Sequence, residues 1–449
     1  LCFPYIFRGA LDVGATTIND EMKLACVRAL ADLTHKELQQ VGTISHQDES
    51  LSFGPDYIIP KPFDPRLLVQ LAPAVAQAAM DSGVATRAID DMQVYRASLD
   101  AFVFRTGLLM KPVFDAAKRD PKRVVYAEGE EPVVLRAVQS VVDHGLAHPI
   151  LIGRPAVIDH RIEKFGLRIE AGKDFEIVNP EKDPRYWDYW TTFHALMERQ
   201  GVSPDTAKIM VRTRTSVIAA LMVHRNEADA LIAGVVGRFR KNLQHVLDVI
   251  GKQHETGTVA AMGALSTPEA DYFICDTNVN SNPNARDIAD ITIMAAEKIQ
   301  IFGLRPRIAL LSHSSFGSYQ DESAQKMKDA LDILREEAPH LEIEGEMTAE
   351  MALNESYRKQ YFPNSCLRGS ANLLVAPNLD AAHIAFGLAR AISNAVGVGP
   401  ILLGAGRPAH VMTPSTTSRR IMNMTALAVV DAQVYERMQA DNTQDNGDS

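Results

Sequence analysis

Short apolar runs alternate with helical repeats along most of this chain. Runs at 124–127, 149–152 and 230–233 are each followed by a stretch that predicts a helix or a turn. Strands that read as continuous apolar runs are typical of sheets buried on both faces, where helices make the connections. The pattern therefore predicts an α/β fold with a mostly parallel sheet. Further strands are expected at 259–264, 272–275, 308–311 and 373–375, and helices at 132–144, 187–199 and 321–337, with one more that ends at 302.

The first 120 residues or so follow a looser pattern. Helix-capping residues at 17–20 predict a helix over about 21–33, and Pro65 stands in the first turn of another helix that runs to 80. The remaining expectations are strands at 1–6 and 57–60, a polar loop over 34–52, a partly helical connection over 90–111 that ends at Pro112, and a disordered polar tail over 441–449.

The stretch from 399 to 420 combines a short strand at 401–403, a glycine loop and a helix that starts near 415. Gly404 and Gly406 interrupt the strand, and Arg407 follows them. A strand that leads through a glycine loop into a helix is where an open α/β sheet usually holds its ligand. Backbone N–H groups, hydroxyls and an arginine favour an anion. A solvated turn explains the same residues equally well, and both interpretations stay open.

Composition narrows the class of protein. The chain has 449 residues, 46% hydrophobic and 23% charged, which suits a globular chain of about three domain-sized units. A net charge of −10 argues against a nucleic-acid binder, and no apolar run approaches the length of a membrane span. The four cysteines have no CxxC spacing, which fits reduced thiols in the cytoplasm and offers no zinc site. The first residues resemble the middle of a fold, so we expect a fragment of a longer protein.

The N-terminal strings FPYIFRGALDVGATTINDEMKL and YIIPKPFDPRLL resemble the end of the nucleotide-binding domain of malic enzymes. The resemblance implies that 1–87 is the C-terminal remnant of a Rossmann-type NAD(P)-binding domain, followed by a helical linker over 88–117. It also implies that the catalytic and metal-binding residues of that family lie upstream, and that the parent enzyme uses NADP and Mg or Mn. Arg8 and Asp12 are either polar site residues or, as the commoner case, a salt-bridged turn.

The strings YAEGEEPVVLRA, LLSHSSFGS, APNLDAAHIAFGLA and GPILLGAGRP resemble phosphate acetyltransferases over about 118–440. The resemblance implies a phosphate acetyltransferase-like (isocitrate/isopropylmalate dehydrogenase-like) three-layer fold. Its two subdomains would cover 118–256 with 396–440, and 257–395, with a cleft between them. The family transfers an acetyl group between CoA and phosphate without a metal, and we expect no metal site and no cofactor in this chain.

Residues of this chain depart from that family's motifs where its chemistry is done. The family's Ser, Arg and Asp, which polarise the acetyl carbonyl and deprotonate the thiol, correspond to Thr413, Pro414 and Arg420. Gly237 stands at a His position and Gln244 at an Arg position, and Phe316 replaces a basic residue. The resemblance therefore implies no catalytic residues. Ligand contacts are expected instead from Ser314, Ser315, Gly317, Ser318, Gly404, Gly406, Arg407, Thr413 and Arg238. Glu344 and Glu346 flank Gly345, but no third metal ligand is visible.

A malic enzyme followed by an acetyltransferase-like unit resembles the bacterial hybrid malic enzymes. The resemblance implies that the C-terminal unit binds acetyl-CoA as an allosteric inhibitor of NADP-dependent malate decarboxylation. It also implies contact with the upstream malic enzyme domain and a homo-oligomer, either a dimer of the acetyltransferase-like domain or a hexamer of the parent. Two alternatives remain: an active phosphate acetyltransferase that uses Thr413 and His410, or a purely structural assembly module.

Overall fold

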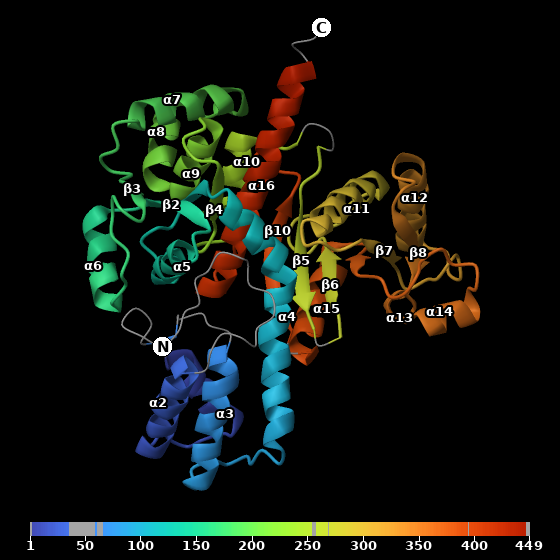
Figure 1. Ribbon diagram of the computed structural model, residues 1–449. Helices are drawn as coiled ribbons and strands as arrows, with labels where there is room; N and C mark the ends of the chain where they lie inside the picture. Colours follow the sequence, from blue (N-terminus) through green and yellow to red (C-terminus); the bar gives the residue numbers. More distant parts are fainter. Residues whose placement is uncertain are drawn as a thin grey trace. The chain divides into compact units, whose positions relative to one another are not determined.

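The computed structural model divides into two compact units, Leu1–Leu108 and Leu109–Ser449. It describes residues 2–35, 59–60, 66–253, 257–267, 269–393 and 395–445. Figure 1 shows both units, and each is described by itself below.

The described elements of regular structure in the first unit are all helices. Its elements are α1 (Phe3–Asp12), α2 (Asp20–His35), α3 (Arg66–Asp81) and the first part of α4 (Met92–Arg119). The two predicted helices are confirmed, and Asn19 caps α2 by accepting a hydrogen bond from the Met22 N–H at 3.0 Å. The strand expected at 1–6 is wrong, because Pro4 opens a helix there instead. The expected loop at 34–52 and strand at 57–60 fall mostly outside the described residues.

Arg8 and Asp12 form an ion pair at 2.7 Å, one turn apart on α1. The Tyr95 hydroxyl also donates to the Asp12 carboxylate at 2.6 Å. The pair therefore links two helices of this unit, and it is a salt bridge on a helix, not in a turn.

The second unit begins within α4, which continues through Pro112 to Arg119. The end expected at Pro112 is wrong. A proline inside a helix costs about 3 kcal/mol, but Leu109, Met110 and Val113 are buried in the core of this unit. Their burial offsets the lost hydrogen bond.

One sheet of the second unit has five strands, all parallel, in the order β11-β4-β1-β2-β3. Its central strands are the predicted apolar runs, confirmed as β1, β2 and β4. The strands are β1 (Lys122–Tyr126), β2 (Ala147–Ile152), β3 (Glu176–Val178), β4 (Ala230–Ala233) and β11 (Ala409–Val411), and the helices are α5 (Pro132–Asp143), α6 (Pro155–Phe165), α7 (Tyr186–Met197), α8 (Pro204–Thr213), α9 (Thr215–His224) and α10 (Phe239–Ile250).

The other sheet has six strands in the order β10-β5-β6-β9-β7-β8, with β5 antiparallel to both of its neighbours. The prediction of a mostly parallel arrangement therefore holds for the β6-β9-β7-β8 part. The strands are β5 (Ala260–Ser266), β6 (Asp271–Cys275), β7 (Arg307–Leu311), β8 (Glu342–Met347), β9 (Leu373–Val375) and β10 (Val396–Leu403), and the helices are α11 (Ala285–Gln300), α12 (Glu322–Glu337), α13 (Ala349–Leu353), α14 (Glu355–Tyr361) and α15 (Leu379–Ser393).

The long helix α16 (Ser418–Asp445) joins the two sheets. It packs against β1 and β4 of the first sheet and β10 of the second; Figure 1 shows α16 in red beside β4 and β10. β10 pairs with β5, so the chain returns to the first sheet after Leu403 and not at residue 396, where the sequence placed the subdomain boundary. Because α16 extends to Asp445, the disorder expected from residue 441 is wrong for 441–445. No described helix is both long and apolar enough to cross a membrane.

Candidate anion pocket

A cavity of about 220 Å³ lies where β10, α15 and the loop between β11 and α16 meet. Its lining includes two arginines, a histidine, hydroxyls and one aromatic ring. The lining residues are Gly263, Thr277, Asn278, His383, Phe386, Gly387, Arg390, Gly397, Val398, Gly399, Pro400, Thr413, Ser415 and Arg420. Two residues singled out in the sequence, Thr413 and Arg420, therefore lie in one pocket.

Local geometry explains how the pocket is built. Gly263 on β5 has no side chain, and the Phe386 ring of α15 occupies the space where a Cβ would stand. The pairing of β10 with β5 shifts register between Val398 and Ile401, so the strand bends at Gly399 and Pro400. Gly263 therefore lets α15 pack close to β5, and the bent part of β10 lines the cavity beside α15.

Thr413 lies in the loop before α16, and Arg420 lies in the first turn of that helix. The Thr413 and Ser415 hydroxyls lie 3.2 Å apart. The Thr417 hydroxyl accepts a hydrogen bond from the Arg420 N–H at 3.3 Å, which orders the first turn of α16. Arg420 thus sits in that first turn, on the cavity wall.

Positive charge dominates the pocket. Burial, and then the neighbouring Arg390 guanidinium, lowers the pKa of Arg420 below its ordinary value. Among the residues that the structure describes, no carboxylate is paired with either Arg390 or Arg420. The His383 ring belongs to the lining, with Nδ1 3.0 Å from the Thr277 carbonyl oxygen. A ligand that enters this pocket meets two guanidinium groups, one imidazole and no carboxylate in the lining.

The serine loop of the sequence motif does not line this pocket. Ser314 donates to the Glu346 carboxylate at 2.9 Å, and the Gly317 N–H donates to the same oxygen at 2.7 Å. The Ser318 hydroxyl accepts from the Ser315 N–H at 2.9 Å. Glu346 therefore uses the donors that the sequence had assigned to a ligand, and the loop is closed on the end of β8.

Gly404, Gly406 and Arg407 also have partners within the protein. A Cβ at Gly404 would collide with the Thr258 carbonyl, and one at Gly406 with the Ile250 carbonyl. The Arg407 guanidinium donates to the Val223 carbonyl at 3.0 Å and lies over the Tyr435 ring. The loop is thus packed against neighbouring backbone and does not line the cavity.

The other predicted positions are dispersed. Arg238 is the N-cap residue of α10, Gly237 precedes it with a φ of 89°, and Gln244 donates to Asp248 on the same helix. Phe316 packs on Phe362 with ring centroids 4.5 Å apart. Pro414 is exposed beside Thr413. None of these residues lines the cavity.

The two carboxylates of β8, Glu344 and Glu346, also have partners within the protein. Glu344 lies 3.3 Å from an Arg335 nitrogen and accepts the Cys366 N–H at 2.7 Å, while Glu346 holds the serine loop. Over the described ranges, no group of three His, Cys, Asp or Glu side chains is arranged to hold a metal ion. The four cysteines are all unpaired.

Sequence reasoning missed a buried carboxylate, Glu128, at the end of β1. One of its oxygens accepts the Gly234 N–H at 3.0 Å, and burial raises its pKa to about 7. Its second oxygen is buried and has no hydrogen-bond partner in the structure. In the sequence, the only sign of this carboxylate was the group of acidic residues Glu128, Glu130 and Glu131.

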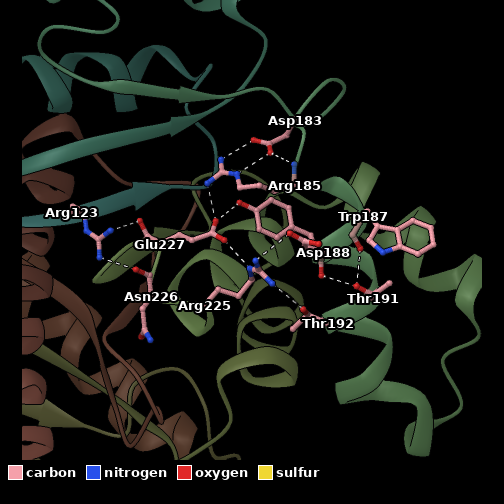
Figure 2. Close-up of polar contacts among 11 residues, drawn as sticks. Arg123, Asp183, Arg185, Trp187, Asp188, Thr191, Thr192, Arg225, Asn226 and Glu227 are labelled. Carbon is pink, nitrogen blue, oxygen red and sulfur yellow. Dashed lines mark hydrogen bonds and ion pairs between the residues drawn. The ribbon is translucent and has the colours of Figure 1, made fainter.

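The polar cluster drawn in Figure 2 provides a contrast with the pocket. Glu227 accepts hydrogen bonds from Tyr189 at 2.6 Å and Arg185 at 2.8 Å. Asp183 forms a further bidentate pair with Arg185. Because acids and bases are matched here, the cluster ties α7 to the end of α9 and offers no free charge to a ligand.

Comparison with known proteins bears on this unit and on the whole chain. The family model for "Phosphate acetyl/butaryl transferase" matches residues 108–429. Two solved phosphotransacetylases have a TM-score of 0.66, namely EutD phosphotransacetylase from Staphylococcus aureus at 21% identity and an enzyme from Streptococcus pyogenes at 24%. They cover 72% and 73% of this chain and 98% of their own. These neighbours confirm the predicted acetyltransferase-like α/β fold.

Among curated proteins, the NADP-dependent malic enzyme of Escherichia coli strain K12 is 55% identical over 96% of this chain. An NAD-dependent malic enzyme of Rhizobium meliloti strain 1021 is 52% identical over 96%. The phosphate acetyltransferase of Clostridium acetobutylicum is 29% identical over 72% of this chain and 98% of its own length. The chain spans 57% and 56% of the two malic enzymes. The predicted resemblance to malic enzymes with an acetyltransferase-like part is confirmed.

Proposed function

The chain belongs to the phosphate acetyl/butaryl transferase family, and from this premise we propose that it is the regulatory and assembly part of a malic enzyme. In this proposal the acetyltransferase-like unit transfers no acetyl group and binds acetyl-CoA as an allosteric inhibitor. The parent protein would oxidise and decarboxylate malate to pyruvate in the cytoplasm, with NADP and Mg or Mn bound in its upstream domain. The remnant over 1–87 and the linker over 88–117 would connect to that domain.

The observation that carries the proposal is the chemistry of the pocket. The lining retains a hydroxyl, Thr413, but has Arg420 where the family has its base. Pro414, which follows Thr413 and does not line the cavity, stands in place of an arginine. Proline has no side-chain donor, and an arginine cannot accept a proton at neutral pH. A general base contributes about 10²–10⁴-fold to a rate, and one donor to an oxyanion about 10²–10³-fold. With both lost, turnover should be negligible while a cavity remains.

The competing idea of an active transferase needs a base near Thr413. His410, the candidate base, is 0% exposed and does not line the cavity. Its Nδ1 accepts the Leu402 N–H at 3.2 Å, and its Nε2 lies 3.2 Å from Asp431. Both ring nitrogens thus face protein groups, which argues against His410 as the base for Thr413.

An exposed apolar stripe on α15 supports the assembly role. Ile384, Leu388 and Ile392, spaced one turn apart, are 65%, 59% and 74% exposed. A stripe of this kind suits a two-fold interface with a second copy of the chain. Light scattering after size exclusion should give twice the chain mass, and Leu388→Glu should give a monomer; a monomeric wild-type chain would contradict this part.

The function is tested with two assays on this chain. We expect no formation of acetyl phosphate from acetyl-CoA and phosphate, and we expect acetyl-CoA to bind in calorimetry. Robust turnover that Thr413→Ala abolishes would establish the active transferase instead. Absence of both turnover and heat would leave only the structural module.

A further inference from the structure

Two cysteine thiols meet in the helical core of the first unit. Cys2 stands at the N-cap position of α1, and Cys26 lies in the middle of α2. Their side chains are hydrogen-bonded to each other, thiol to thiol, and no disulfide joins them. Both belong to one hydrophobic cluster, in which Cys26 is 1% exposed and Cys2 is partly exposed. Two reduced thiols in contact are the state from which a disulfide forms.

Secondary structure holds both cysteines in place. The Cys2 carbonyl accepts the Tyr5 N–H at 3.1 Å and the Ile6 N–H at 2.9 Å, which fixes its backbone to the first turn of α1. Cys26 lies one helical turn after Met22, and both side chains are buried in the same cluster. Because the two thiols come from different helices, their contact results from the packing of α1 with α2 and not from local chain geometry.

We propose that Cys2 and Cys26 form a dithiol site that hydrogen peroxide oxidises to a disulfide between α1 and α2. The proposal does not depend on acetyl-CoA, since it concerns only the first unit. In the cytoplasm proposed for the parent protein, thiols are kept reduced, so the disulfide would form during exposure to peroxide and be reduced again afterwards.

The two thiols have different roles because their surroundings differ. Burial, and then the hydrogen bond to Cys2, raises the pKa of Cys26 to about 12, so this thiol stays protonated at neutral pH. Peroxides react with accessible thiolates, and a buried thiol of this kind is inert on its own. Cys2 therefore reacts first, and Cys26 attacks the oxidised Cys2.

The oxidation takes two steps. The Cys2 sulfur, as the thiolate, attacks one oxygen of hydrogen peroxide, so that an S–O bond forms, the O–O bond breaks and the leaving hydroxide takes up the thiol proton as water. The sulfur is oxidised to a sulfenic acid and the peroxide is reduced. The Cys26 sulfur then attacks the Cys2 sulfur, the S–O bond breaks and the hydroxide leaves with the Cys26 proton as a second water. A dithiol reductant reverses the reaction by exchange.

The remaining cysteines, both in the second unit, serve as internal references. Cys275 on β6 is 0% exposed, and burial raises its pKa. We therefore expect peroxide to leave Cys275 unchanged. Cys366 is exposed and is a competing target for peroxide. Cys366→Ser removes this competitor, and Cys366 in the wild-type chain reports whether the peroxide was active.

The test treats the full chain carrying Cys366→Ser with an equimolar amount of hydrogen peroxide. The chain is then unfolded, the remaining thiols are blocked with N-ethylmaleimide, and mass spectrometry maps them. We expect peptides linked through Cys2 and Cys26, with Cys275 blocked, and dithiothreitol should release both linked thiols. The oxidised chain should also melt at a higher temperature than the reduced chain, because a cross-link restricts the unfolded state.

Two variants separate the roles of the thiols. With Cys2→Ser, Cys26 should stay fully blocked and oxidation should not shift the melting temperature. With Cys26→Ala, dimedone should trap a sulfenic acid on Cys2. Circular dichroism checks folding, and the partly exposed position of Cys2 keeps the first variant informative if the second does not fold.

Three results would overturn the site. The first is that Cys2 and Cys26 both stay blocked under conditions that oxidise Cys366 of the wild-type chain. The second is a sulfinic acid on Cys2 beside a reduced Cys26. The third is a disulfide that joins two chains instead of the two helices. None of these results bears on acetyl-CoA binding, so the proposed function would stand or fall separately.

Discussion

Replacing Lys298 with methionine should destabilise the unit that carries the pocket. Lys298 of α11 lies 2.5 Å from Asp431 of α16, and His410 of β11 lies 3.2 Å from the other carboxylate oxygen. The side chains of Lys298 and Asp431 are 16% and 12% exposed. Burial alone would raise the pKa of Asp431, but Lys298 and His410 hold it below its ordinary value. The cluster joins α11 beside the second sheet to α16, which positions Arg420.

Removing one partner of a buried ion pair costs about 3–5 kcal/mol, because the other charge stays buried. We expect Lys298→Met to fall near the lower figure, since His410 still faces Asp431. Lys359→Met is the matched control, because its partner Glu355 lies 2.7 Å away on the surface of the same helix and exposed pairs of this kind contribute little to stability. The double variant Lys298→Met/Asp431→Leu should recover most of the loss.

Urea unfolding at pH 7.5, followed by circular dichroism, measures these differences. A loss below about 1 kcal/mol for Lys298→Met, or a double variant no better than the single one, would show that the pair does not stabilise the contact between α11 and α16. The pKa of Asp431 also fixes how its contribution to stability changes with pH. Because the pKa of Asp431 is lowered, its stabilising contribution is present at neutral pH and is lost as the pH falls through the acid range.

Three further changes have defined outcomes. Glu128→Gln should raise the free energy of unfolding at pH 8, by at most about 3 kcal/mol, but not at pH 5. The reason is that a pKa raised to about 7 makes ionised Glu128 unfavourable in the folded protein. A variant with the same unfolding midpoint as the wild type at both pH values would contradict this. Arg407→Ala should lower the free energy of unfolding by about 1–2 kcal/mol through its lost hydrogen bonds and leave acetyl-CoA affinity unchanged in calorimetry; a loss of affinity without a loss of stability would restore Arg407 to the site. Asn284→Ala should cost about 1 kcal/mol in urea unfolding, because Asn284 and Asp287 form a capping box on α11, and an unchanged midpoint would refute that role.

The sequence was most informative where periodicity and burial agree. The runs that became β1, β4 and β9 are buried in the sheets, and their alternation with helical repeats marked them as strands. The apolar start at residues 1–6 had no such context, and a short apolar run alone fits a buried strand or a helix end equally well. Pro112 misled for another reason: its local preference is overruled by tertiary packing around α4.

The pocket was only partly visible in the sequence. Thr413 and Arg420 were found through their positions in a family motif, but Arg390 and Phe386 come from another helix and Gly263 from a strand far along the chain. No local pattern connects such residues. Gly404 and Gly406 were predicted as ligand contacts but do not line the cavity. Close packing against neighbouring backbone and close approach to a ligand both require glycine, so the sequence alone does not distinguish them.

The most direct test of a sensing function uses the parent protein that contains this chain. Its malate-dependent reduction of NADP should be measured while acetyl-CoA is titrated through the range that saturates the chain in calorimetry. The rate should fall along the same saturation curve, with a coupling between the sites of about 1–3 kcal/mol. A rate that stays constant while acetyl-CoA occupies the pocket would contradict regulation by this unit.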